Sequence, residues 1–162
     1  MRKATRRMPE EWALDVFDKA PYVTVSMIRP DGTPYGVPVN MVRKDDRTFY
    51  FHCADEGEKI DCIKYCPTVS LSAVSRCTPK FEEEKNNFTE YYNSAIAIGK
   101  AQTVKDREEK ILALRLLCER FLPRYMMHFN EAIARSLDRT TIIRITLDEP
   151  AVGKRKGSQR HT

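Results

Sequence analysis

Long hydrophobic runs are missing from this sequence. Its apolar stretches are only a few residues long, whereas a helix needs roughly 20 apolar residues to cross a bilayer. The mean hydropathy is -0.54, and 31% of the residues are charged. The first seven residues are basic, as in a signal peptide, but Pro9, Glu10 and Glu11 stand where the apolar part would follow. We therefore expect a cytoplasmic protein with no membrane span.

Cysteine is present in a small, odd number. The 162 residues suffice for one domain, and with 41% hydrophobic residues the chain can bury a core without covalent bridges. We therefore expect the five cysteines to be reduced thiols, not a disulfide framework. Cys62 and Cys66 lie four residues apart, with His52 and Cys53 nearby, but a structural zinc site needs four ligands held together. We expect no metal.

Glycine is scarce, at six residues. None of the glycine-rich signatures of hydrolase nucleophiles, triphosphate-binding loops or dinucleotide-binding turns is present. The acidic run Glu82, Glu83 and Glu84 falls in a predicted loop, where paired-carboxylate catalysis has little support. These absences argue against a hydrolase triad and against nucleotide triphosphate chemistry.

A general basic face is also missing, although the net charge is +5. Four basic residues lie among the first seven, and four more lie between Lys154 and Arg160, so the middle of the chain is close to neutral. A nucleic-acid binder is expected to carry a basic patch over its folded surface. We therefore interpret the two ends as solvated basic tails.

The hydrophobic pattern switches between helical and strand-like periods along the chain. The predicted helices are 9–20, a short helix opened by Gly57 that ends before Pro67, a helix through Leu122 capped by Asp106, and 130–137. The predicted strands are 22–28, 35–42, 48–53, 69–74, 90–104 and 140–147. The acidic range 76–88 has no period and is predicted as a long surface loop. Gly99 is predicted at a bend or bulge.

Hairpins dominate this order of elements, and only the crossovers are helical. The order favours the α+β class, as a mainly antiparallel small barrel with helices at its rim, over a doubly wound parallel sheet. Pro38 cannot donate a hydrogen bond to a neighbouring strand. Its position is therefore expected at an edge, at a bulge, or facing something other than a strand.

The junction between the strand 48–53 and the following helix carries the most chemistry. A helix start offers free backbone N–H groups and the positive end of the helix dipole, and Lys59 adds a full charge, so a phosphate would be held there. His52 ends the strand beside this loop, where an imidazole can donate to a bound anion and exchange protons near neutral pH. The alternative is an ordinary strand-to-helix turn with a solvated lysine and a histidine bonded to a backbone carbonyl.

Two motifs and a following Pro-x-Val give the chain a family resemblance. They are Asp31-Gly32-x-Pro34-Tyr35-Gly36-Val37-Pro38-Val39-Asn40, then Tyr50-Phe51-His52-x-Ala54-x-x-Gly57-x-Lys59-x-Asp61, then Pro67-x-Val69. Together they resemble the pyridoxamine 5′-phosphate oxidase-like superfamily and, within it, the nitroimidazole-resistance (Nim-type) flavoproteins. The resemblance runs from about Pro21 to Gly153.

The resemblance implies a split β-barrel homodimer with two FMN molecules at the subunit interface. It divides the chain into a basic arm and helix (1–20), the FMN-binding split-barrel domain (21–153) and a basic, disordered tail (154–162). The residues that it assigns to cofactor binding are Val37, Pro38, Val39 and Asn40 flanking the ring, Phe51 and His52 beside it, Glu58 and Lys59 at the phosphate, Ser72 as a hydroxyl donor, and Ser94 from the partner subunit. His52 is also the expected catalytic residue.

The sequence departs from the family's oxidases at two places. An Arg-Lys pair at the phosphate loop is replaced by Glu58-Lys59, so one of two cations is missing, and backbone donors, Ser72 or the segment 153–155 must compensate. The C-terminal substrate motif, with its tryptophan and arginines, is absent as well. We therefore do not expect pyridoxamine phosphate as the substrate.

The leading hypothesis is an FMN-dependent oxidoreductase that passes electrons from a reductant to a small acceptor, with nitroaromatic compounds among the candidates. A second hypothesis is a flavin-binding or flavin-sensing protein without turnover. A third is a barrel that binds single-stranded nucleic acid through Tyr91, Tyr92 and the basic tail. Some relatives of this barrel hold heme or a deazaflavin instead of FMN, and the resemblance leaves those cofactors open.

Overall fold

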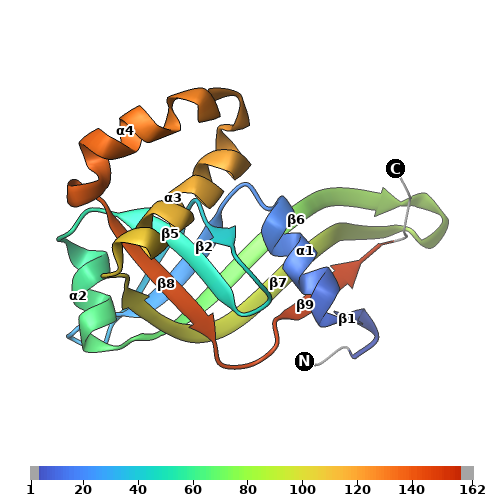
Figure 1. The fold of residues 1–162 in the computed structure, drawn as a ribbon. Helices are drawn as coiled ribbons and strands as arrows, with labels where there is room; N and C mark the ends of the chain where they lie inside the picture. The colour runs from blue at the N-terminus through green and yellow to red at the C-terminus, as the bar shows by residue number, and fades with distance from the viewer. Residues whose placement is uncertain (1–3, 158–162) are drawn as a thin grey trace.

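The computed structural model describes residues 4–157 and consists of a nine-stranded antiparallel sheet with four α-helices (Figure 1). The strands are β1 (Arg7–Met8), β2 (Val23–Ile28), β3 (Pro34–Val39), β4 (Val42–Arg43), β5 (Thr48–Cys53), β6 (Thr68–Glu82), β7 (Asn87–Thr103), β8 (Thr141–Leu147) and β9 (Val152–Lys156). The helices are α1 (Glu10–Lys19), α2 (Glu58–Tyr65), α3 (Arg107–Phe121) and α4 (Phe129–Ser136).

The strands follow the order β3-β2-β6-β7-β8-β5-β4, and β9 adds to β7 and β1. This path does not return to its first strand, so the curled sheet is an open, split barrel. The predicted α+β class with a mainly antiparallel split barrel and rim helices is therefore confirmed. No helix among residues 4–157 is long and apolar enough to span a membrane.

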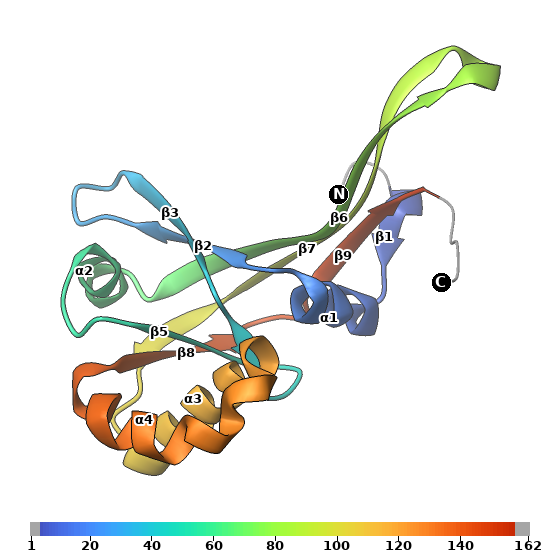
Figure 2. The same ribbon diagram turned by 90° about the horizontal axis from the view of Figure 1, so that it is seen from above.

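Alternation along the strands sends one set of apolar side chains into the barrel. Val25, Phe51, Leu71 and Ile143 are fully buried there, where α1 and α2 also contribute to the core. A second, smaller core lies on the other side of β5 and β8, where α3 and α4 cover Tyr50 and neighbouring apolar residues. Figure 2 shows these two helices lying along that side of the sheet.

The outward side chains of β2, β6 and β7 form a surface that remains largely accessible, which we call the open face. It carries small polar residues and four exposed aliphatic ones, Ile28 (38% exposed), Val74 (47%), Ile96 (52%) and Ile98 (51%). Four aliphatic residues gathered on one flat face are unusual for a surface that stays in water.

The helix boundaries follow the expected signals. Asp106 accepts a hydrogen bond from the Glu109 backbone N–H at 2.8 Å, which confirms its predicted N-cap role. Gly57 precedes α2 with a φ of 112°, a left-handed value that favours glycine. Gly99 lies within β7, between Val69 and Leu147, and marks no bulge. A β-carbon there would come within 2.4 Å of the Thr146 carbonyl oxygen, so the close approach of β8 explains the glycine.

The predicted loop 76–88 is wrong. These residues extend β6 and begin β7, which pair as far as Glu82 and Asn87 in a long two-stranded hairpin. The strand β9 was not predicted either. The first residues of the predicted basic tail, through Lys156, belong to it, and residues 158–162 lie outside the described part.

Tyr50 anchors α3 to the outer side of β5. Its hydroxyl donates to Glu109 at 2.7 Å, and Arg144 donates to both oxygens of the same carboxylate at 2.8 and 2.9 Å. Burial, followed by the hydrogen bond to Glu109, raises the pKa of Tyr50 above its ordinary value near 10. The folded chain therefore keeps this proton at alkaline pH, where the unfolded chain has lost it.

We therefore expect the stabilising effect of Tyr50 to be complete below pH 10 and to decline as the pH rises above that value. Tyr50→Phe should lower the free energy of unfolding at pH 7 by about 1–2 kcal/mol through the lost hydrogen bond. The free energy of unfolding of the variant should also fall less steeply above pH 10 than that of the parent protein. Urea titrations at pH 7 to 11 measure both effects, with exposed Tyr125→Phe as the control; an unchanged alkaline slope would contradict the assignment.

Candidate functional site

The N-terminus of α2 presents free hydrogen-bond donors at one end of the barrel. In the first turn of α2, the Gly57 carbonyl accepts hydrogen bonds from the backbone N–H groups of Ile60 and Asp61. No side chain caps this end of the helix. The first N–H groups of a helix have no intrahelical acceptor. A β-carbon on Gly57 would meet no atom within 4 Å, so the space beside the loop is open.

Lys59 adds a cation to this helix start. It is half-buried, and among the described residues it makes no hydrogen bond or ion pair. Burial raises the pKa of the Cys53 thiol at the end of β5, and the positive charge of Lys59 opposes part of that rise. The connection 54–57 is all that separates the end of β5, which carries His52, from the helix that carries Lys59.

Glu58, which stands where the family's oxidases have arginine, is paired with Arg29. The Arg29 guanidinium donates to the Glu58 carboxylate and to the Pro34 carbonyl at 3.1 Å, and it lies over the Tyr35 ring at 4.9 Å. The hairpin between β2 and β3 thus brings a cation to α2 from 29 residues away. Arg29 was missed by sequence reasoning, since nothing local marks it.

His52 and Phe51 point to opposite sides of β5. His52 pairs with Ile142 of β8 and is exposed on the outer side. The side chain of Phe51 is fully buried in the barrel core, so it can offer only backbone groups to a ligand on the outer side. The arrangement leaves the imidazole accessible at the end of the barrel that also holds Lys59.

The residues on and after β3 that were predicted to flank the flavin ring point alternately to the two sides of the sheet. Val37 and Val39 pack against the core, whereas Pro38 and Asn40 are exposed. Pro38, Val39 and Asn40 line a shallow hollow of about 410 Å³ together with Tyr22 and Thr24. Asn40 also donates to the Pro21 carbonyl at 3.3 Å.

Ser72 lies on the open face beside this hollow. It pairs with Thr24 of β2, which pairs with Pro38 on its other side. Ser72 and Thr24 line a second hollow of about 360 Å³ that adjoins the first at Tyr22. Small side chains therefore form a flat wall from β3 to β6, which is suited to a planar ring.

Ser94 lies far from His52 within one chain. Ser94 pairs with Val74 on the open face. Ten residues further along the chain, the Val104 N–H donates to the carbonyl of Ile142, which pairs with His52. Ten extended residues span roughly 33 Å. Within one chain, Ser94 instead adjoins Ser72 on the open face, because Val74 pairs with Ser94 and Ser72 pairs with the nearby Ile96.

The residues present fit a flavin phosphate and ring. The helix start with Lys59 offers donors and a positive charge, and Arg29 neutralises the carboxylate of Glu58 beside it. The wall of Pro38, Thr24 and Ser72 offers a flat surface. Among residues 4–157, no group of three or more His, Cys, Asp or Glu side chains is placed to hold a metal ion.

Comparison with protein families identifies the chain over most of its length. A family model described as pyridoxamine 5′-phosphate oxidase matches residues 9–154. Comparison with curated proteins finds no match.

Solved structures share the fold at low sequence identity. A candidate 5-nitroimidazole antibiotic resistance protein from Bacteroides thetaiotaomicron is 20% identical, with a TM-score of 0.76 over 91% of this chain and 85% of that one. A flavocytochrome from Azotobacter vinelandii is 17% identical (TM-score 0.78; 93% and 68%). A FAD- and heme-binding protein from Mycobacterium smegmatis is 18% identical (TM-score 0.77; 96% and 74%). At these identities the similarity establishes the fold alone.

Proposed function

The chain belongs to the pyridoxamine 5′-phosphate oxidase family, and on that premise we propose that it is an FMN-dependent oxidoreductase acting on a small acceptor. The observation that carries the proposal is that the open start of α2, with Lys59, follows the end of β5, with the accessible His52, after the short connection 54–57. A phosphate donor set and a proton-exchanging group thereby share one end of the barrel.

The phosphate would be bound by the free N–H groups of α2 and by Lys59. Both act on the same charge, since the helix dipole and the ammonium each favour an anion. Arg29 supports this site indirectly, because its ion pair with Glu58 offsets a carboxylate that would repel a phosphate. The missing arginine of the family's oxidases is thus partly replaced by a cation from another hairpin.

The flavin ring would lie along Pro38 and Asn40, with His52 near its edge. When bound, a flavin supplies the electron-carrying chemistry, and the protein supplies orientation and electrostatics. His52 is exposed and carries a titratable nitrogen that can donate a hydrogen bond or a proton to the acceptor. Candidate acceptors include nitroaromatic compounds, in line with the resemblance to the Nim-type proteins.

The functional unit in this proposal is a homodimer. The open face carries exposed Ile96 and Ile98, which a second copy would bury. Ser94 lies on the same face as Ile96, so a second copy that covers this face would also cover Ser94.

The first test is the visible absorbance spectrum of the purified protein, with any released chromophore identified by mass. Flavin bands with FMN released would support the proposal, whereas a heme spectrum would assign the barrel to another cofactor. A protein that stays colourless after incubation with FMN would refute it. Salt-sensitive binding of a single-stranded oligonucleotide by such a colourless protein would favour the nucleic-acid alternative.

We expect His52→Ala to lower kcat for acceptor reduction about 100-fold, since a positioned proton donor typically contributes that much. FMN affinity should change less than threefold, because the phosphate site is untouched. Stopped-flow reoxidation of the reduced protein and an FMN titration measure the two quantities, with exposed His128→Ala as the control. Loss of FMN without a separate defect in turnover would contradict the catalytic role, and no reduced acceptor in the parent protein would favour the non-catalytic alternative.

A further inference from the structure

The far end of the β6–β7 hairpin, residues 76–93, projects beyond the rest of the sheet and is called the arm here (Figure 2). β6 and β7 have 15 and 17 residues, whereas strands usually have about 5–6. Beyond the last pairing with β9, at Tyr92, the arm is a two-stranded ribbon. An isolated two-stranded ribbon is marginally stable in water, so a long one needs support from elsewhere.

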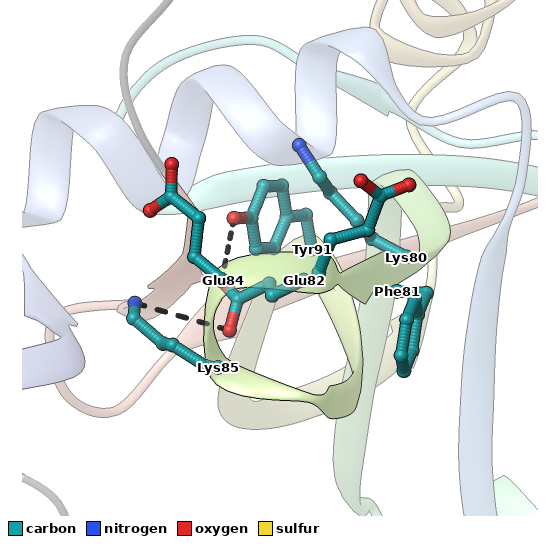
Figure 3. Close-up of a pocket in the computed structure, with 7 residues that line it drawn as sticks. Lys80, Phe81, Glu82, Glu84, Lys85 and Tyr91 are labelled. Atoms are coloured by element: carbon teal, nitrogen blue, oxygen red, sulfur yellow. Dashed lines mark hydrogen bonds and ion pairs between the residues drawn. The ribbon is translucent and has the colours of Figure 1, made fainter.

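One face of the arm is supported within the chain. Glu82 accepts from the Tyr91 hydroxyl at 2.8 Å, and Lys80 lies over the Tyr91 ring at 5.4 Å. Thr89, on the same face, accepts from Lys156 of β9. A hollow of about 500 Å³ lies here, and Figure 3 shows Lys80, Tyr91 and Lys85 among the residues that line it.

The other face is exposed, and its far end is aromatic, followed by Glu90, which accepts from the Cys77 thiol. Phe81 and Phe88 are directly opposite each other, with ring centroids 4.7 Å apart. Phe88 is 86% exposed and Phe81 is 42% exposed. Pro79 and Cys77 continue the same row toward the sheet, because alternate residues share a face. Phe88 therefore contacts water over most of its surface, and Phe81 over somewhat less than half.

A bulge makes this face continuous with the open face. Along β7, residues 88, 90, 92, 94, 96 and 98 alternate regularly and share one side, on which Glu90 is the one acidic residue. On β6, the register shifts by one residue between Val74 and Arg76, which moves the odd-numbered Phe81 to the side that Val74 occupies. Phe81 and Phe88 thus extend the surface that carries Val74, Ile96 and Ile98.

The arm and the rest of the chain differ in the sign of their net charge. The arm has three basic residues (Arg76, Lys80, Lys85) and four acidic ones (Glu82, Glu83, Glu84, Glu90), a net charge of −1. The whole chain carries +5, so the remainder carries +6. Contact between the arm of one copy and the body of another therefore joins opposite net charges, whereas the two whole copies, at +5 each, repel at long range.

We propose that the arm is a dimerisation arm: its Phe81–Phe88 face packs on the body of a second copy, beside the contact made by the open face. In a two-fold dimer each chain gives one arm and receives one. The arm reaches past the edge of the open face, so a copy that covers Ile96 lies within the arm's reach. The proposal needs the dimer of the proposed function but not its flavin.

The test is the dimer dissociation constant of Phe81→Ser/Phe88→Ser, measured by sedimentation equilibrium. Removing two large aromatic anchors from each of two arms should raise this constant at least about 100-fold. Met127→Ser is the matched control, because Met127 is 82% exposed and lies in the 3-10 turn 123–128, on another part of the molecule. Met127→Ser should leave the constant within twofold of the parent value.

A second measurement does not depend on the stability of the altered arm. Photoreactive p-benzoylphenylalanine in place of Phe88 should give a covalent dimer on irradiation, and the cross-linked peptide should come from the body of a differently tagged copy. A monomeric parent protein, an unchanged dissociation constant, or cross-links only within one chain would each overturn the proposal. If the protein binds FMN but the arm fails these tests, the proposed cofactor stands and the dimerisation arm is refuted. If an arm-dependent dimer forms but FMN does not bind, the dimerisation arm stands and the proposed flavin function is refuted.

Discussion

Lys59→Ala is expected to weaken FMN binding about 30-fold while leaving riboflavin binding unchanged. A charge-assisted hydrogen bond to a phosphate contributes about 2 kcal/mol, which corresponds to a change of that size. Riboflavin has the same ring but no phosphate, so it does not engage the ammonium. Lys59 has no partner among the described residues whose loss would disturb the fold.

Quenching of flavin fluorescence during titration gives both dissociation constants. Lys64→Ala is the matched control, because Lys64 lies on the same helix but is exposed on another side. Its effect on FMN affinity should be below threefold and should disappear in high salt. Equal losses of FMN and riboflavin affinity in Lys59→Ala would indicate a structural role, and unchanged FMN affinity would remove Lys59 from the phosphate site.

The sequence predicts the barrel well wherever a strand has one face in the core. β5 was predicted at 48–53 and spans Thr48–Cys53, because Phe49 and Phe51 alternate with residues of the outer side. Asp106 was predicted as the cap of α3, because capping depends on residues three positions apart. Both features are determined by neighbours in the chain.

The arm and β9 could not be predicted from local sequence patterns. Residues 76–88 have solvent on both sides and therefore lack the two-residue alternation that marks a half-buried strand. Their pairing is imposed by β7, across the ladder from Phe81 to Phe88. The basic β9 looks like a solvated tail, yet Gly153 packs so closely under Trp12 that a β-carbon would come within 2.6 Å of the indole.

The sequence predicted that the candidate site would bind an anion, but it did not predict all of the residues near that site. Gly57 and Lys59 form a local motif that indicates an anion site, because a helix start and a nearby cation suffice. The same reasoning could not identify Arg29, because only the fold brings this residue to Glu58. The division of β5 into an inward Phe51 and an outward His52 follows from alternation, but which side carries the site depends on tertiary structure.

Arg120→Met is expected to lower the free energy of unfolding by about 3 kcal/mol, or about 10 °C in Tm for a chain of this length. The Arg120 guanidinium donates to the carbonyls of Met41, Phe17 and Ala20 at 2.7, 2.8 and 2.9 Å. Burial lowers the pKa of Arg120 from its usual value, as expected for a charge held by neutral acceptors. Methionine keeps most of the packing but leaves three carbonyls without a donor.

The same substitution should reach the proposed ring site. Met41 and Ala20 directly adjoin Asn40 and Pro21, whose hydrogen bond closes the end of the hollow beside Pro38. Arg120 therefore holds together the two segments that form this wall. We expect Arg120→Met to raise the FMN dissociation rate several-fold at a temperature where the protein is still folded.

Differential scanning calorimetry and stopped-flow release of FMN measure the two effects, with exposed Arg124→Met as the control. Arg120→Lys should be intermediate in Tm, because an ammonium keeps the charge but cannot span three carbonyls in the plane of a guanidinium. A normal Tm in Arg120→Met would show that water replaces the guanidinium at no cost. A lowered Tm with an unchanged FMN dissociation rate would separate the stability of the barrel from the geometry of its hollow.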